Sequence, residues 1–78
     1  GERSLMPMYT VRLNVRNLLD PAQIDVKYLS RLRGYPEFID QKAVATRFES
    51  REDAMDAAEN MNDHFHLVVS ASLEEVEA

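Results

Sequence analysis

A strict alternation of apolar and polar residues near the N-terminus is the strongest constraint on the fold. Between residues 8 and 16 every second side chain is apolar, namely Tyr9, Val11, Leu13 and Val15. A period of two with β-branched residues predicts a strand that buries one face. An apolar sheet face must be covered, so the rest of the chain has to supply a second layer.

The core between these layers must be small. The chain has 78 residues and no cysteine, so we expect one domain without disulfide support. No apolar run reaches the ~20 residues of a membrane span, and the N-terminus has no signal-peptide core. We therefore expect a cytoplasmic α+β domain over residues 8–73. Residues 1–7 are expected to be a flexible segment and candidate cloning remnant, and residues 74–78 a frayed acidic tail.

A helix is predicted to follow the first strand. Asp20 suits an N-cap, Pro21 suits the first helical position, and Gln23 completes a capping box. Gly34 stands where a left-handed C-cap belongs, and Pro36 prevents the helix from resuming. These signals predict a helix from residue 20 to about residue 33.

The second half of the chain repeats this order. Phe38 and Ile39 are predicted to form a short edge strand, and residues 42–48 the second main strand. Ser50 begins a second helix as its N-cap. Residues 65–73 alternate again and form the third main strand. The apolar stripe of the second helix consists of small residues and one methionine: Ala54, Ala57, Ala58 and Met61.

These elements predict a two-layer α+β fold with three main antiparallel strands, a short fourth strand and two helices on one face. The first strand would lie in the centre, between residues 42–48 and 65–73. Right-handed crossovers then favour a ferredoxin-like βα(β)βαβ arrangement. The chain resembles that architecture in its element order alone.

Several kinds of chemistry are excluded by composition. Phosphate-binding loops and nucleophile elbows need glycines, and the chain has one glycine after residue 1. The acidic residues of the second helix form a solvated stripe, without the burial that tunes a catalytic carboxylate. We therefore predict no enzyme, no catalytic residues and no cofactor.

His64 and His66 are the best metal-ligand candidates. In a strand, residues two apart share a face, so both imidazoles could reach one metal. A stable site needs a third ligand, and only Glu37 or Asp40 could fold close. The alternative is two histidines on a solvated sheet face, and we predict no metal site.

The charge is divided unevenly along the chain. Residues 1–47 carry eight Lys/Arg against five Asp/Glu, whereas residues 48–78 carry one against nine. The net charge of −5 disfavours a general nucleic-acid binder. A nucleic-acid-associated factor remains the alternative function, and it would use five arginines: Arg12, Arg16, Arg31, Arg33 and Arg47.

The favoured function is a small non-enzymatic protein-interaction module, such as an accessory or regulatory protein of a bacterium or phage. Its partner would be another protein or a second copy, and residues 42–48 would offer an exposed strand edge for a homodimer. No membrane partner is expected. The candidate contacts come from the open sheet face and the aromatic loop: Arg12, Ala43, Ala45, Arg47, His66, Val68, Tyr35 and Phe38.

Overall fold

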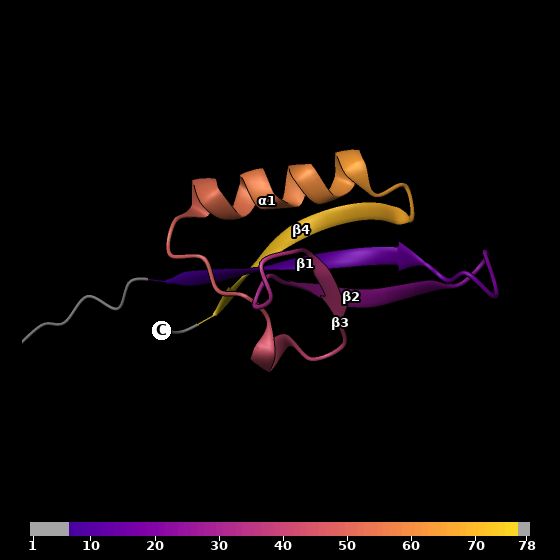
Figure 1. The fold of residues 1–78 in the computed structure, drawn as a ribbon, viewed down its shortest axis with the longest axis horizontal. Coiled ribbons are helices and arrows are strands. Elements are labelled where there is room, and N and C mark those ends of the chain that lie inside the picture. The colour runs from indigo at the N-terminus through magenta and orange to yellow at the C-terminus, as the bar shows by residue number, and fades with distance from the viewer. Residues whose placement is uncertain (1–6, 77–78) are drawn as a thin grey trace, which may run out of the picture.

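The alternating segment Met8–Arg16 forms strand β1, as predicted, and β1 is an inner strand of a four-stranded antiparallel sheet. The computed structural model describes residues 7–76, and its strand order is β3-β2-β1-β4. One α-helix covers one face of this sheet, while a short 3-10 helix lies on the other face (Figure 1). The remaining elements are β2 (Ile24–Ser30), β3 (Glu37–Ile39), η1 (Lys42–Val44), α1 (Arg51–His64) and β4 (Val68–Val76).

The ferredoxin-like arrangement with two helices is wrong, because the predicted first helix does not form. Asn17 Oδ1 accepts hydrogen bonds from the amides of Leu19 and Asp20, at 2.8 and 3.0 Å. Asp20 Oδ1 accepts another from the amide of Ala22 at 3.2 Å. Side chains that close a tight turn in this way have the same sequence signature as a helix N-cap. The turn sends the chain straight back as β2, in which β-branched Ile24 favours a strand.

The strand predicted for residues 42–48 is also wrong. The segment forms η1 and a loop, in which Ala45 is buried. The segment forms one β-bridge, at its last residue: Phe48 exchanges two backbone hydrogen bonds with Tyr9, at 2.9 and 2.8 Å. The Thr46 amide adds a single bond to the Leu29 carbonyl of β2 at 3.1 Å. Alanine has a weak preference for strands, which explains why this alternation does not extend. The short strand at Phe38 and Ile39 does form, within β3, but it pairs with β2.

Helix α1 has the start and the buried stripe that its sequence predicts. The Ser50 side chain caps it, with Oγ accepting a hydrogen bond from the Asp53 amide at 3.3 Å. The stripe packs on β1 and β4 because alanines let the helix approach the sheet closely. The core cluster combines all these elements: Val11, Leu13, Val15, Leu29, Ala57, Ala58, Met61 and Val68.

The last strand starts and ends three residues later than predicted. β4 pairs along its whole length with β1, from Val68 opposite Val15 to Val76 opposite Met8. It therefore extends into the segment that was expected to fray. A register shift opposite Asn14 and Val15 leaves Val69 as an extra, exposed residue. Leu13 in β1 is fully buried, whereas Leu67, just before β4, is only half-buried beside the core.

Candidate protein-interaction edge

Strand β4 forms one edge of the sheet, and no segment within residues 7–76 pairs with its outer side. It is nine residues long, whereas β3 at the opposite edge has three residues and follows Pro36. A long unpaired strand presents a row of backbone donors and acceptors to solvent. The two edges of the sheet are therefore unequal, and β4 is the one that can accept another strand.

The backbone groups that face outward can be assigned from one pair of hydrogen bonds. Tyr9 directs its amide and carbonyl to Phe48, away from β4. Because these directions alternate along a strand, Thr10, Arg12 and Asn14 direct theirs toward β4. Their partners Glu74, Ser72 and Ser70 are thus bonded to β1. The free outward amides and carbonyls of β4 belong to the residues between them, including Ala71, Leu73 and Glu75.

A groove runs beside these outward groups, between α1 and β4. It has a volume of about 450 Å³, with Arg51 and Glu59 among the helix residues that line it. Two large apolar side chains are partly exposed at the groove, Met55 by 38% and Val69 by 46%. Its apolar wall comes from both elements: Met55, Ala58, Val69, Ala71 and Leu73. An added strand would place alternate side chains against this wall.

The first six residues of β4 carry little of the usual protection of an edge strand. Soluble proteins commonly protect such edges with lysine, proline or an inward-pointing charge. The run from Val68 to Leu73 has no charged residue and no proline. Its protection is limited to the irregularity at Val69 and to Glu74 and Glu75 at the far end.

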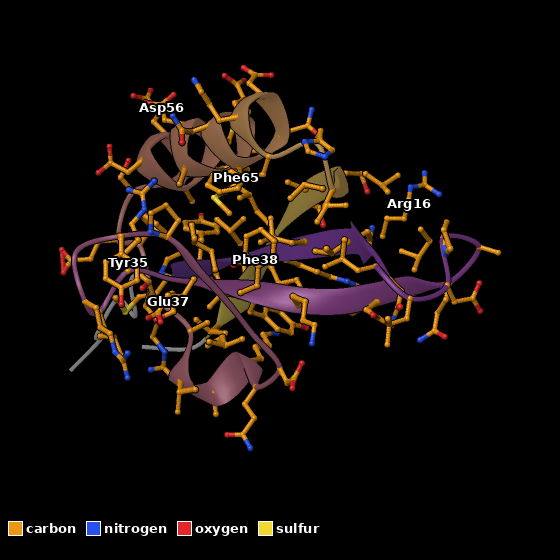
Figure 2. All side chains as sticks on the ribbon, turned by 45° about the vertical axis from the view of Figure 1, so that its right-hand side comes forward. Arg16, Tyr35, Glu37, Phe38, Asp56 and Phe65 are labelled. Carbon is orange, nitrogen blue, oxygen red and sulfur yellow. The ribbon has the colours of Figure 1, made fainter. Side chains whose placement is uncertain are left out.

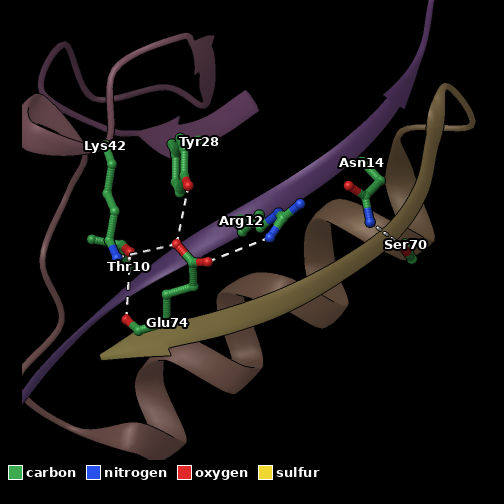
Figure 3. A network of polar contacts seen from close by, with 7 residues as sticks. All are labelled: Thr10, Arg12, Asn14, Tyr28, Lys42, Ser70 and Glu74. Atoms are coloured by element: carbon green, nitrogen blue, oxygen red, sulfur yellow. Dashed lines mark hydrogen bonds and ion pairs between the residues drawn. The ribbon is translucent and has the colours of Figure 1, made fainter. Parts of the chain in front are cut away.

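Glu74 is the centre of a polar network on the face opposite α1 (Figure 3). Its carboxylate accepts a hydrogen bond from the Tyr28 hydroxyl at 3.0 Å. It also pairs with Lys42 at 3.2 Å and with Arg12 at 3.5 Å. The Thr10 hydroxyl donates to the Glu74 carbonyl at 3.4 Å. The network ties η1, β2 and β1 to the end of β4.

The charges of this network shift two pKa values in opposite directions. Burial alone would raise the pKa of Glu74, but hydrogen bonds from Lys42 and Tyr28, with the charges of Lys42 and Arg12, lower it overall. Burial, and then the bond to Glu74, raises the pKa of the Tyr28 hydroxyl. Both shifts keep a carboxylate and a neutral phenol at neutral pH. All the partners of the carboxylate are side chains of the same chain, so the role of the network is to hold the C-terminal end of β4 against the rest of the sheet.

A second exposed apolar group lies at the turn between β1 and β2. Leu18 and Leu19 are 78% and 96% exposed at its tip. The side-chain oxygens of Asn17 and Asp20 accept hydrogen bonds from amides of the turn and hold it in one shape. The tip has no groove among the described cavities and no row of free backbone groups, so it defines no binding geometry of its own.

The eight residues predicted to contact a partner do not form one surface. Val68 and Ala45 are buried, and Arg12 belongs to the Glu74 network. The ring of Phe38 packs against Phe65 with centroids 5.7 Å apart, so it covers the edge of the core (Figure 2). The other four are exposed at separate places: Tyr35, Ala43, Arg47 and His66. A partner-binding role for these residues stays a prediction.

The five arginines proposed for nucleic acid are also dispersed. Arg16 donates to the Pro21 carbonyl at 2.8 Å, at the tip of the β1–β2 hairpin. Arg33 pairs with Glu37 at 3.9 Å, and Glu37 lies on the opposite side of the molecule from Arg16 in Figure 2. The guanidinium of Arg31 lies 5.9 Å from the centre of the Phe48 ring. Because Arg12 is paired to Glu74 and Arg16 lies at the hairpin tip, the five arginines are not gathered on one basic surface.

The two histidines do not share a strand face. His64 is the last residue of α1, where its ring nitrogen Nδ1 lies 3.0 Å from the Asn60 carbonyl oxygen, and His66 lies in the following turn. Among residues 7–76, no group of three or more His, Cys, Asp or Glu side chains is arranged to hold a metal ion. The strand geometry on which a shared metal site depended is therefore missing.

Sequence reasoning missed the groove and the edge of β4. Neither Met55 nor Val69 was among the candidate contact residues. The available signal was the run from Val68 to Leu73, which combines strand-forming residues with no edge protection.

Comparison with protein-family models, curated protein sequences and solved structures produced no match to this chain. The described residues include no helix long and apolar enough to cross a membrane.

Proposed function

We propose that the protein is a small non-enzymatic interaction module that binds an extended segment of a protein by strand addition along β4. One observation carries this proposal: the outward backbone groups of Ala71, Leu73 and Glu75 lie beside an apolar groove. Strand addition takes affinity from main-chain hydrogen bonds and specificity from pockets for alternate side chains. The edge of β4 supplies the main-chain hydrogen bonds, and the groove supplies the pockets for alternate side chains.

The other functions have less support. The arginines of the nucleic-acid alternative are scattered, and three of them contact an acidic side chain or a backbone carbonyl. Base stacking on a sheet needs exposed aromatic rings. Tyr28, on the open face, instead donates to Glu74. A cytoplasmic location stays a prediction from composition.

A displayed library of random 12-residue peptides tests strand addition. Peptides enriched on the immobilised protein should carry alternating apolar residues and shift the amide resonances of Val69, Ala71 and Leu73. Binding should fall in the Ala71→Pro variant, which lacks one outward donor, and persist in Leu19→Glu at the hairpin tip. Enrichment of peptides that shift only the hairpin or β3 resonances, or no enrichment at all, would contradict the proposal.

A further inference from the structure

We propose that the segment that adds to β4 is the β4 strand of a second copy of this chain, paired antiparallel across a two-fold axis at Ala71. This inference rests on the proposed function, since it names the occupant of the same edge. It converts two four-stranded sheets into one continuous sheet of twice that width. Three features of the edge favour this partner over an unlike one.

The first feature is the position of the helix. Figure 1 and the packing of α1 place it over both β1 and β4, so its axis lies near the boundary between these strands. Neighbouring strands are about 4.8 Å apart. A second β4 at that spacing puts the two helix axes about two strand spacings, or ~10 Å, apart. Helices pack in direct contact at about 8–10 Å. Sheet pairing and helix packing are therefore satisfied by one arrangement.

The second feature is the order of residues along β4. With Ala71 opposite Ala71 of the second copy, Val69 lies opposite Leu73, and this pair occurs twice. Ala71 has outward-facing backbone groups, so this register aligns the donors and acceptors of the two Ala71 residues at the centre. The antiparallel direction also keeps the acidic ends apart: the two Glu75 residues are separated by eight residues, about 27 Å. A parallel pairing would instead place Glu74 and Glu75 beside their own copies.

The third feature is the stripe that α1 presents to the groove. Helix α1 runs opposite to β4, so the two-fold axis sets the two helices antiparallel (Figure 1). The groove-lining stripe has Arg51 at its start, Met55 in the middle, and Glu59 and Asn62 toward its end. Antiparallel pairing brings Met55 side chains together at the centre and Arg51 beside Glu59 of the second copy. Arg51 is the one arginine of α1, which has no lysine, and it lies where the opposite helix offers an acid.

Sedimentation equilibrium of the full chain tests the second copy directly. The wild type should sediment at micromolar concentrations as a dimer, with twice the 9.0 kDa mass of one chain. Met55→Glu puts two carboxylates at the helix contact and should weaken the dimer at least about tenfold. Leu19→Glu makes the same kind of change at the exposed hairpin tip and should leave the dimer intact. Loss of the dimer in Leu19→Glu alone would overturn the β4 interface.

A charge exchange tests the register. Arg51→Glu and Glu59→Arg should each weaken the dimer a few-fold because like charges then meet across the axis. The double variant should recover most of the wild-type affinity. Both positions lie on the exposed surface of α1, so circular dichroism can confirm that each variant still folds. A double variant as weak as the worse single variant would contradict this arrangement.

The two proposals fail differently. A wild type that stays a single 9.0 kDa species far above micromolar concentration, while library peptides still shift the β4 amides, removes the second copy and leaves strand addition. A monomer for which no peptide selects the β4 edge removes both. The inference is also overturned if the wild type is a dimer but its outward β4 amides exchange with deuterium as fast as those of the Met55→Glu variant.

Discussion

The Tyr28 hydroxyl reaches over the inner strand β1 to donate a 3.0 Å hydrogen bond to Glu74. β2 and β4 are not neighbours in the sheet, so this bond joins strands that share no backbone pairing. Arg12, from the strand between them, pairs with the same carboxylate at 3.5 Å. The strand that presents the free edge is therefore anchored by side chains at its C-terminal end.

Removing the Glu74 charge should destabilise the fold. Glu74→Gln keeps the size of the side chain but leaves Lys42 and Arg12 without their anion. We expect a loss of about 1–2 kcal/mol in the free energy of unfolding, measured by urea denaturation. Glu75→Gln is the matched control, because Glu75 is exposed and should change stability by less than ~0.5 kcal/mol. Equal effects of the two changes would mean that the network contributes nothing.

The Glu74 network should also make stability depend on acid. The pKa of the Glu74 carboxyl is lower in the folded protein than the ordinary value of 4.5. The network therefore stabilises the fold at a pH above 4.5. This stability should disappear as the pH falls below 4.5 and through the folded pKa. Glu74→Gln should lose less stability than the wild type between pH 7 and pH 3. Hydrogen bonds from Gln23 and Asn17 also lower the pKa of Asp25. Asp25 is present in both proteins, so its contribution cancels in the comparison. Identical losses in the two proteins would refute this account.

Proline substitution should distinguish the two sides of β4. Ser72 is paired with Arg12 and directs its amide to β1, so Ser72→Pro breaks the ladder and should cost about 3 kcal/mol or more. Ala71 directs its amide outward, where a proline removes no bond within the chain. Ala71→Pro should therefore be the more stable of the two by about 1–3 kcal/mol in urea denaturation. The opposite order would show that the outward residues have been assigned wrongly.

Gly34 should resist substitution through its backbone alone. Its φ is +86°, and a Cβ built there meets no atom within 4 Å. Gly34→Val should cost about 1–2 kcal/mol, because a β-branched residue is strained in the left-handed region. Asn tolerates this region better, so Gly34→Asn should cost less. Thermal denaturation of both variants measures the difference, and a valine variant as stable as the wild type would exclude the strained backbone.

The elements predicted correctly are those whose local signals allow one reading. β1 combines strict alternation with β-branched residues, and α1 combines a serine cap with a small-residue stripe. The segment after Asp20 carried a cap, a proline and apolar residues that fit a helix or a turn followed by a strand. The hydrogen bonds that Asn17 Oδ1 accepts favour the turn, and they depend on a loop geometry that the sequence pattern does not specify. The positive φ of Gly34 was predicted, although it follows a strand and not a helix.

The candidate site was beyond sequence reasoning for a different reason. Whether a strand lies at an edge depends on the order of strands in the sheet. Because residues 42–48 were expected to pair beside β1, the free edge was assigned to them. Once β2 occupies that place, β4 is left as the long edge strand, and nothing within residues 7–76 pairs with its outer side. The groove follows from the same order, since it needs α1 and an edge strand side by side.

The pairing of β4 with β1 also has a consequence for how the chain folds. Thr10 and Glu74 meet although 64 positions separate them, whereas β1 and β2 are joined by a short turn. Closing a long loop costs entropy before its contacts form, so we expect the β1–β2 hairpin to assemble early and β4 to dock last. Pulse-labelled hydrogen exchange should then protect the amide of Lys27, which is paired with Leu13, before that of Ser72. A newly made chain would thus expose one side of β1 until its final strand arrives, and the strand that completes the sheet is also the strand left unpaired at its edge.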